Sequence, residues 1–410
     1  MRPLTPLFLL IFCAALPAGT FAMSVAGDKA LATLLDRARA THSDAVVVWQ
    51  DGLEVGHYYK NGRAPGPIEL MSVTKSVVAL GIGQLIASGK LKSVDQPVAD
   101  FYPEWRQGRK KDITLRMLMN HTSGLQNVRR ADEEIYPAPD AVQLALAAEL
   151  TTPPGQVLEY NNKAVNLLSG VIEKASGERM DRFFRDGLFH DMDIRFGTWE
   201  ADSGGRPYAM SGLPLTAADL GKLGTLVMNR GRWQGRQLVP AAYVDTMLGT
   251  DKRDDSPVGL LWWRLAQWQH FEPDPAAFAY LRQHGVPEET ADTLERGLRD
   301  KRFGSVQAMF AGLQAVLGPK AQAILDQQLI SRGIGPYRLF HATSGPYVAF
   351  NANGDGGQFV VVVPAAGIVA VRQIDSDVDR ESAGEAYEDF VERVVAIAQA
   401  EGRLPPIPSL

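Results

Sequence analysis

Residues 72–88 read Ser72-Val-Thr-Lys-Ser-Val-Val-Ala-Leu-Gly-Ile-Gly-Gln-Leu-Ile-Ala-Ser88, and Gly89 follows them. Apolar side chains recur on nearly every face of a helix of this length, so the segment predicts a helix that is buried on all sides. A glycine directly after such a run is typical of a helix end. We therefore expect a core helix that begins at Ser72, with the other elements packed around it.

Strand patterns lie towards both ends of the sequence, and helical patterns lie between them. Apolar β-forming residues at 45–49 and 53–59 flank Gln50-Asp-Gly52, which predicts a β-hairpin. Further strands are expected at 347–350, 358–363 and 368–372. This order predicts an α+β fold whose sheet joins the two ends of the chain. Helices are expected at 28–40, 93–105, 113–119, 138–150, 163–175, 180–188, 216–229, 276–284, 288–299, 306–317, 320–331 and 381–400.

The composition is that of a globular protein. Of the 410 residues, 45% are hydrophobic, and 42 Lys+Arg stand against 47 Asp+Glu, which gives a formal charge of −5. The chain has no basic excess to neutralise phosphates or anionic lipid, so we expect no nucleic-acid partner. The length suits a large single-fold enzyme with two lobes.

The first 22 residues have the pattern of a secretory signal peptide. Arg2 precedes an apolar run at 7–16, and small residues lead to Ala22, where we expect cleavage. The run is too short to span a bilayer, so no integral membrane span is expected. The single cysteine, Cys13, lies inside this leader, and the bulky Phe12 before it is unlike a lipoprotein signal. The mature chain is therefore predicted to be secreted or periplasmic and free of disulfides.

Several motifs of cofactor and metal chemistry do not occur in the sequence. The seven histidines form no pair at zinc-site spacing, and neither a dinucleotide-binding nor a phosphate-binding glycine loop is found. The Gly-x-Ser-x-Gly pattern of α/β-hydrolases is also missing. We therefore expect no metal and no cofactor.

Ser72-Val-Thr-Lys75 is the strongest remaining candidate for chemistry. A serine hydroxyl needs a base within hydrogen-bond reach, and a lysine three positions on lies about one helical turn away on the same face. Burial would disfavour the ammonium form and make Lys75 a plausible base. A helix-capping serine followed by a lysine that extends to solvent would give the same four residues.

Two Tyr-x-Asn triplets could supply a second base. Tyr59-Lys-Asn61 ends a predicted strand ahead of Ser72, whereas Tyr160-Asn-Asn162 follows a Pro-Pro-Gly turn well after it. The residues alone do not choose between them.

Six segments, taken in order, resemble the class C β-lactamase-like serine hydrolases. That family contains penicillin-binding carboxypeptidases, esterases and amide hydrolases that cleave 6-aminohexanoate oligomers. The resemblance covers about residues 28–265 and 346–371. It implies a β-lactamase/transpeptidase-like fold, with an antiparallel sheet flanked by helices and a second, mostly helical lobe. The segments are residues 72–75, 91–97, 113–125, 154–162, 211–220 and 356–364.

The resemblance also implies roles for single residues. Ser72 would be the acylated nucleophile, Lys75 its proton partner and Tyr160 the second base. Asn162 would position Lys75 and the substrate amide, and the backbone N–H groups of Ser72 and Asp355 would form the oxyanion hole. A free phenol has a pKa of about 10, so Tyr160 could act as a base only if the Lys75 cation stabilised its phenolate.

Ala352-Asn353-Gly354 departs from the family pattern, because many relatives carry Lys-Thr-Gly or His-x-Gly there. Small residues would still let a carbonyl approach the backbone, but the usual partner for a substrate carboxylate is missing. We therefore expect neutral esters or amides as substrates, in contact with Asn353, Gly354, Gly356 and Trp263. A tight hairpin would also explain the glycines, and core packing would also explain the tryptophan.

The sequence thus predicts a leader at 1–22, one hydrolase domain at 23–404 and a tail at 405–410. Within the domain we expect a sheet lobe at about 28–95 and 346–400 and a helical lobe at about 96–265. A helical insertion at about 266–345 has no counterpart in short family members, and we expect it to pack beside the pocket as a lid or wall.

The expected function is that of a secreted serine hydrolase that cleaves a small-molecule ester or amide through an acyl-enzyme on Ser72, with Lys75 and Tyr160 transferring protons. One alternative is a β-lactamase or D-Ala-D-Ala carboxypeptidase that acts on β-lactams or peptidoglycan. Another is a non-catalytic cell-wall-binding or sensor protein that retains the pocket. The oligomeric state does not follow from the sequence.

Overall fold

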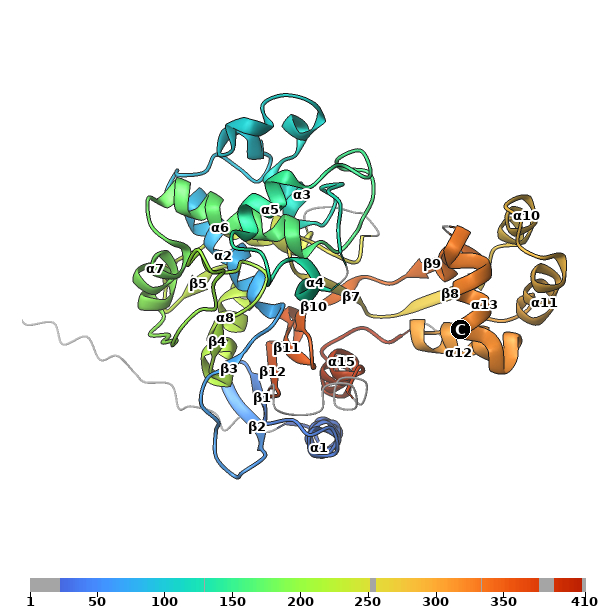
Figure 1. Cartoon of the computed structure of the whole chain (residues 1–410). Coiled ribbons are helices and arrows are strands. Elements are labelled where there is room, and N and C mark those ends of the chain that lie inside the picture. Colours follow the sequence, from blue (N-terminus) through green and yellow to red (C-terminus); the bar gives the residue numbers. More distant parts are fainter. Residues whose placement is uncertain (1–22, 129, 251–255, 333, 376–386, 408–410) are drawn as a thin grey trace, which may run out of the picture.

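The computed structural model describes residues 23–128, 130–250, 256–332, 334–375 and 387–407, so the predicted leader lies outside it. Its centre is a six-stranded antiparallel sheet in the order β2-β1-β12-β11-β10-β7 (Figure 1). The expected α+β class, with a sheet that joins the two ends of the chain, is confirmed. The strands are β1 (Ala45–Gln50), β2 (Leu53–Tyr59), β7 (Trp263–Ala266), β10 (Tyr347–Gly354), β11 (Gln358–Val363) and β12 (Ile368–Gln373).

Strands β1 and β2 form the hairpin that the sequence predicts. Its turn residues, Asp51 and Gly52, have φ values of 51° and 82°. Positive φ at both central residues is what a two-residue turn between twisted strands requires, and glycine adopts it without steric cost. The turn therefore sets the register that pairs Gln50 with Leu53.

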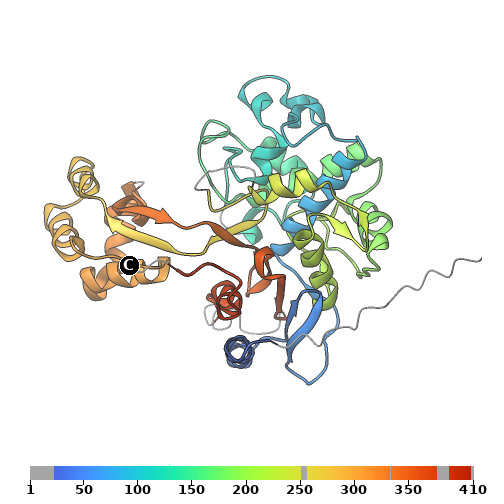
Figure 2. The same cartoon turned by 180° about the vertical axis from the view of Figure 1, so that it is seen from behind.

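Helices α1 (Val25–Ala40) and α15 (Phe390–Ala400) cover one face of the sheet and lie side by side in both views (Figures 1 and 2). Their apolar faces share a core with side chains of β1, β11 and β12. This core includes Leu34 of α1, Val46 of β1 and Val361 of β11. The start of α15 differs from the predicted helix, of which residues 381–386 lie outside the described residues.

The opposite face carries α8 (Ala217–Met228) and, beyond it, the helical lobe. A Cβ added at Gly224 would lie 2.6 Å from Val369 Cγ1, so α8 approaches the sheet more closely than a larger residue would allow. Helix α2 (Val73–Ala87) runs through this lobe and is buried at 12 of its 15 positions. It is the core helix that the sequence predicts, and it packs against α6 (Asn162–Ser176).

The rest of the helical lobe has shorter helices than expected. Residues 93–105 contain only two single-turn 3₁₀ helices, each starting at or next to a proline, Pro97 or Pro103. Proline lacks the N–H that a continuous helix needs and clashes with the preceding turn. The lobe also contains α3 (Leu115–Met119), α4 (Ala131–Glu134), α5 (Ala141–Ala147), α7 (Met180–Phe184) and α9 (Ala241–Leu248), and short strand pairs β3 (Ile68–Glu69) with β4 (Pro214–Leu215) and β5 (Arg232–Trp233) with β6 (Arg236–Gln237).

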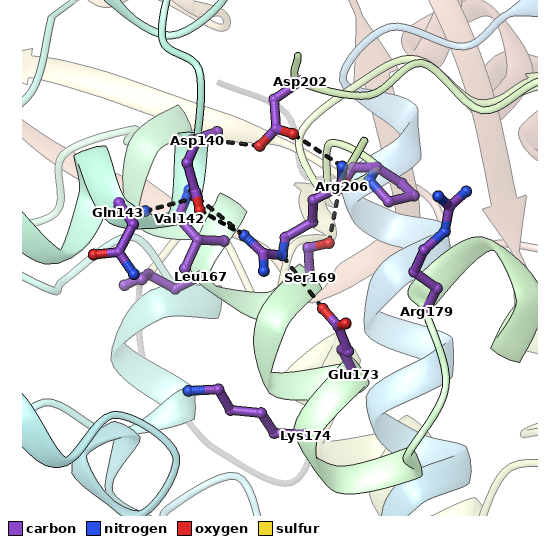
Figure 3. A network of polar contacts seen from close by, with 12 residues as sticks. Asp140, Val142, Gln143, Leu167, Ser169, Glu173, Lys174, Arg179, Asp202 and Arg206 are labelled. Atoms are coloured by element: carbon purple, nitrogen blue, oxygen red, sulfur yellow. Dashed lines mark hydrogen bonds and ion pairs between the residues drawn. The ribbon is translucent and has the colours of Figure 1, made fainter. Parts of the chain in front are cut away.

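A polar network connects the segment at 202–206 to α5 and α6 (Figure 3). Arg206 Nη1 lies 3.0 Å from Asp140, and its Nε lies 3.3 Å from Glu173. Asp202 accepts hydrogen bonds from the backbone N–H groups of Ala141 and Arg206. Burial alone would raise the pKa of Asp140, but two backbone N–H groups at the start of α5 and the guanidinium together hold this pKa below its usual value.

Residues 269–344 form a module with its own apolar core. Strands β8 (Gln269–Pro273) and β9 (Phe340–Ser344) pair with each other and connect the module to β7 and β10. The module extends away from the central sheet (Figures 1 and 2). None of the helices among the described residues is long and apolar enough to cross a membrane. The module's helices are α10 (Pro275–Gln283), α11 (Glu288–Leu298), α12 (Val306–Leu317) and α13 (Ala321–Ile324), and its core includes Phe271, Phe278, Leu294, Leu313 and Phe340.

Candidate active site

Ser72 immediately precedes helix α2, and its hydroxyl faces two polar groups. Its Oγ lies 2.8 Å from Lys75 Nζ and 2.8 Å from the Tyr160 hydroxyl. The backbone of Ser72 is already helical, and its side chain makes no capping hydrogen bond. The capping alternative therefore does not describe this serine.

Lys75 is buried beside Ser72, with only 3% of its surface exposed. Its Nζ donates a second hydrogen bond to the carbonyl oxygen of Met210, at 2.7 Å. Burial lowers the pKa of the amine, and the neighbouring Tyr160 partly opposes this shift. The lysine does not extend to solvent, and burial favours the neutral form that can accept a proton from Ser72.

Tyr160 precedes α6 and comes from the other side of the site. Its ring centroid lies 4.6 Å from that of His121 and 6.4 Å from that of Trp263. Burial, followed by the charge of Lys75, lowers the pKa of His121 to about 3, so this imidazole is neutral near pH 7. The other candidate, Tyr59, lies in β2 with its ring stacked on His57 and lines a different surface hollow.

A cavity of about 910 Å³ opens at Ser72 and Lys75. The end of β10 forms one wall with Asn353, Gly354 and Asp355. A Cβ added at Gly354 would lie only 2.5 Å from the carbonyl oxygen of Leu70 and 3.0 Å from the backbone nitrogen of Ser72. The strand end therefore contacts the start of α2 directly. The other wall residues are Glu69, Met71, Arg130, Ala131, Asp132, Tyr136, Tyr160, Asn162, Glu200, Met210 and Ser211.

Asn162 lines this cavity but does not hold Lys75 as the sequence predicts. The amine is bound by the main chain of Met210, on a loop that the sequence reasoning did not connect with it. Asn162 Oδ1 is buried and has no hydrogen-bond partner among the described residues. The contact with Lys75 that the resemblance implies for this oxygen is thus not seen among the described residues, and the role of Asn162 towards a substrate amide stays a prediction.

Two other predicted substrate contacts do not belong to the cavity wall. Gly356 lies in the turn after β10, and its carbonyl oxygen accepts a hydrogen bond from the buried Arg372. Trp263 lies in β7 and reaches the site only through its ring contact with Tyr160. Its neighbour Trp262 is a core residue whose Nε1 donates to the carbonyl of Ser76.

The insertion does not act as a lid in this structure. No residue of its described parts, 266–332 and 334–345, contributes to the cavity wall. The β8–β9 pair, which the sequence reasoning missed, carries the helices away from β7 and β10. The apolar faces of the helices pack against one another in the module's own core, so they need no cover from the rest of the protein.

The sequence did not reveal several residues of the cavity wall, nor the main-chain carbonyl of Met210 that binds Lys75. The charged residues Glu69, Asp132 and Glu200 had no motif that could have indicated them. Met210 directly precedes a segment of the family resemblance, but a main-chain carbonyl leaves no signal in a sequence. Across the described parts of the chain, no group of three or more His, Cys, Asp or Glu residues could hold a metal ion.

A sequence model of the β-lactamase family matches residues 29–391, which is most of the chain. The chain belongs to the β-lactamase family. The resemblance found in its motifs is thereby confirmed. Two similar proteins of this kind have been named for their activities. The 6-aminohexanoate-dimer hydrolase of Paenarthrobacter ureafaciens is 26% identical over 55% of this chain, and Esterase EstB of Burkholderia gladioli is 31% identical over 27% of it.

These matches are partial, because they span 63% of the first relative and 32% of the second. Solved structures of similar fold cover more of the chain. A putative 6-aminohexanoate-dimer hydrolase from Bacillus anthracis has a TM-score of 0.57 at 17% identity, covering 89% of this chain and 82% of its own. A class C β-lactamase has a TM-score of 0.55 at 16% identity, covering 92% and 98%. At such identities they establish the fold of this β-lactamase family member.

Proposed function

We propose that this β-lactamase family member is a secreted serine hydrolase that cleaves an ester or an amide through an acyl-enzyme on Ser72. The observation that carries the proposal is the position of the Ser72 hydroxyl, 2.8 Å from both the buried Lys75 amine and the Tyr160 hydroxyl at the wall of a large cavity. Secretion rests on the leader pattern of residues 1–22 alone.

Acylation begins when the Ser72 oxygen attacks the substrate carbonyl carbon and its proton moves to Lys75. Burial lowers the pKa of this amine, so the neutral base is populated at a lower pH than for an exposed lysine. The new negative charge develops on the carbonyl oxygen, where the backbone N–H groups of Ser72 and Asp355 stabilise it. The contact of Gly354 with the Ser72 nitrogen supports this arrangement.

The tetrahedral intermediate then collapses and the leaving group departs. Its alcohol or amine takes up the proton that Ser72 lost, delivered from Lys75 through the Tyr160 hydroxyl. Water enters next, gives a proton to the same pair and attacks the acyl carbon. When the bond to Ser72 breaks, the pair returns a proton to the Ser72 oxygen, which releases the acid and restores the free serine. A substrate N–H would also supply the donor that the buried Asn162 Oδ1 lacks among the described residues.

The charges of the cavity wall support a substrate without a carboxylate at the β10 edge. Ala352 stands where many relatives carry a cation, Asp355 follows Gly354 at the same edge, and Arg130 is paired with Asp132. A β-lactam or a D-Ala-D-Ala peptide would bring its carboxylate towards this acidic edge. The relatives named as an esterase and an amide hydrolase support the same substrate class.

Wild-type protein and Ser72→Ala, assayed in parallel, test the proposal. Both are incubated with short-chain p-nitrophenyl esters, a small amide and a β-lactam, and separately with a fluorophosphonate followed by mass spectrometry. We expect ester or amide turnover and one adduct on Ser72 in the wild type, and neither in the variant. Turnover of the β-lactam alone would favour the β-lactamase reading. Absence of both adduct and turnover would identify a binding protein.

A further inference from the structure

One residue outside the predicted set contacts the main chain that holds Lys75. Asn166 lies on α6, one helical turn after Asn162, and only 1% of its surface is exposed. Its Oδ1 accepts a hydrogen bond from the backbone N–H of Met210 at 3.2 Å. The carbonyl oxygen of the same Met210 accepts the hydrogen bond from Lys75 Nζ. Met210 is thus held by α6 on one side and binds the catalytic helix α2 on the other.

The segment around Met210 is fixed at its flanks as well. The Trp199 indole N–H lies 2.9 Å from the carbonyl oxygen of Tyr208 and 3.1 Å from that of Ser211. Between these two points, Asn166 is the side chain that binds the backbone N–H of Met210. This contact can therefore fix the position of the Met210 carbonyl, which is the acceptor for Lys75.

This acceptor matters because a neutral amine has two N–H groups and one lone pair. When Met210 binds one N–H group, the rotation of the amine about its C–N bond is restricted. The lone pair can then face Ser72 Oγ, which lies 2.8 Å away and must give up its proton. A displacement of about 1 Å at this point can cost on the order of 100-fold in rate.

The second polar atom of Asn166 points to the same role. Its Nδ2 is buried without a hydrogen-bond partner among the described residues, which costs free energy. A leucine of similar size would avoid this cost at a position that is otherwise part of the core. An asparagine here is explained by its oxygen, because the Met210 N–H can only donate.

We propose that Asn166 is a positioning residue for the proton transfer, which fixes the Met210 backbone so that its carbonyl directs Lys75 towards Ser72. The inference rests on the proposed function, since it assigns a support to the base of that reaction. Asn166 does not touch the substrate or the reacting atoms.

The variants Asn166→Leu and Asn166→Asp separate this role from simple packing. Leucine keeps the volume and removes the acceptor, whereas aspartate keeps an acceptor oxygen in either protonation state. Ser169→Ala is the matched control, because Ser169 lies on the same helix, is equally buried and donates to the nearby Pro207 carbonyl, 2.7 Å away (Figure 3). It leaves the Met210 contact intact. Thermal melts confirm folding, and Asn166→Ala replaces Asn166→Leu if the latter does not fold.

The readout is the rate at which a fluorophosphonate labels Ser72, measured across pH together with kcat and KM for an ester. A carbonyl acceptor favours the charged amine, so its loss lowers the pKa of Lys75 further. The acidic limb of the pH–rate profile, where the rate falls because Lys75 becomes protonated, then moves to lower pH. Of the titratable groups near Lys75, Tyr160 raises the pKa of the amine, and His121 has its own pKa lowered to about 3 and stays neutral.

We expect Asn166→Leu to lower kcat by about 10- to 100-fold with little change in KM, and to shift the acidic limb. Asn166→Asp should recover most of the rate, and Ser169→Ala should leave the limb in place. The inference is overturned if Asn166→Leu matches the wild type, if its limb does not move, or if aspartate is no better than leucine. Failure of Ser72 labelling in the wild type would overturn the proposed function itself, and is therefore a distinct result.

Discussion

Gly354→Ala tests the contact between strand β10 and the start of helix α2. The added Cβ would lie 2.5 Å from the Leu70 carbonyl oxygen and 3.0 Å from the Ser72 nitrogen, whereas ordinary contacts begin at 3.4 Å. Both neighbours are backbone atoms and cannot rotate away. The strand end must therefore move by about 1 Å, a displacement that can cost on the order of 100-fold in rate.

The displacement separates the two N–H groups that we place around the developing oxyanion. Loss of one such donor lowers kcat by about 10²–10³-fold, or about 2.7–4 kcal/mol, so we expect a loss of at least 100-fold for Gly354→Ala. Overpacking should also lower the free energy of unfolding by about 1–3 kcal/mol. Steady-state kinetics with a p-nitrophenyl ester and urea unfolding measure the two effects.

Gly66→Ala is the matched control, because a Cβ added there has no atom within 4 Å. It should keep both the activity and the stability of the wild type. If Gly354→Ala lost the expected stability but kept its kcat, the end of β10 would not take part in stabilising the transition state. The oxyanion site would then have to be sought elsewhere in the cavity.

Three further predictions concern the site and the module. Tyr160→Phe keeps the ring contact with His121 but removes the hydroxyl at Ser72, so kcat should fall by about 10²–10⁴-fold while urea unfolding changes by less than about 1 kcal/mol. Lys75→Met should abolish turnover and raise the free energy of unfolding by about 1–4 kcal/mol. The wild type should gain stability as pH rises from the lowered pKa of Lys75 towards the ordinary lysine value of about 10.4, because the unfolded state binds more protons there, and urea unfolding at several pH values should show that the variant lacks this slope. A short glycine linker in place of residues 269–344 should leave folding and ester turnover intact, because the Trp268 carbonyl and Gly345 N–H that flank the deletion are already hydrogen-bonded at 2.9 Å.

Local periodicity explains which parts of the fold the sequence could predict. Three of the four helices predicted in the insertion, at 276–284, 288–299 and 306–317, have bounds within one residue of their patterns, and only the last, at 320–331, breaks into shorter turns. The predicted helix at 93–105 failed because its prolines outweigh its apolar spacing. Strands β8 and β9 were missed because polar residues such as Gln269 and Glu272 dominate this short pair, in which only Phe271 and Phe340 are buried.

The site shows the same division between local and distant contacts. The approach of Lys75 to Ser72 follows from a spacing of three residues on one helix. The choice of Tyr160 over Tyr59 needed the family resemblance, because 88 residues separate Tyr160 from Ser72. The Met210 carbonyl, 135 residues from Lys75, could not be predicted, since every residue type carries one.

The pairing of β1 with β12 has a consequence for the synthesis and folding of the protein. Residues 45–50 leave the ribosome long before residues 368–373, their neighbours in the sheet, have been made. The β1–β2 hairpin therefore stays without its partner strand β12 until almost all of the chain has been made. The oxyanion site that we propose around Ser72 cannot be complete during this interval, because the end of β10, which lies against the Ser72 nitrogen, is also made late. The order of synthesis therefore puts completion of the proposed site among the last steps of folding.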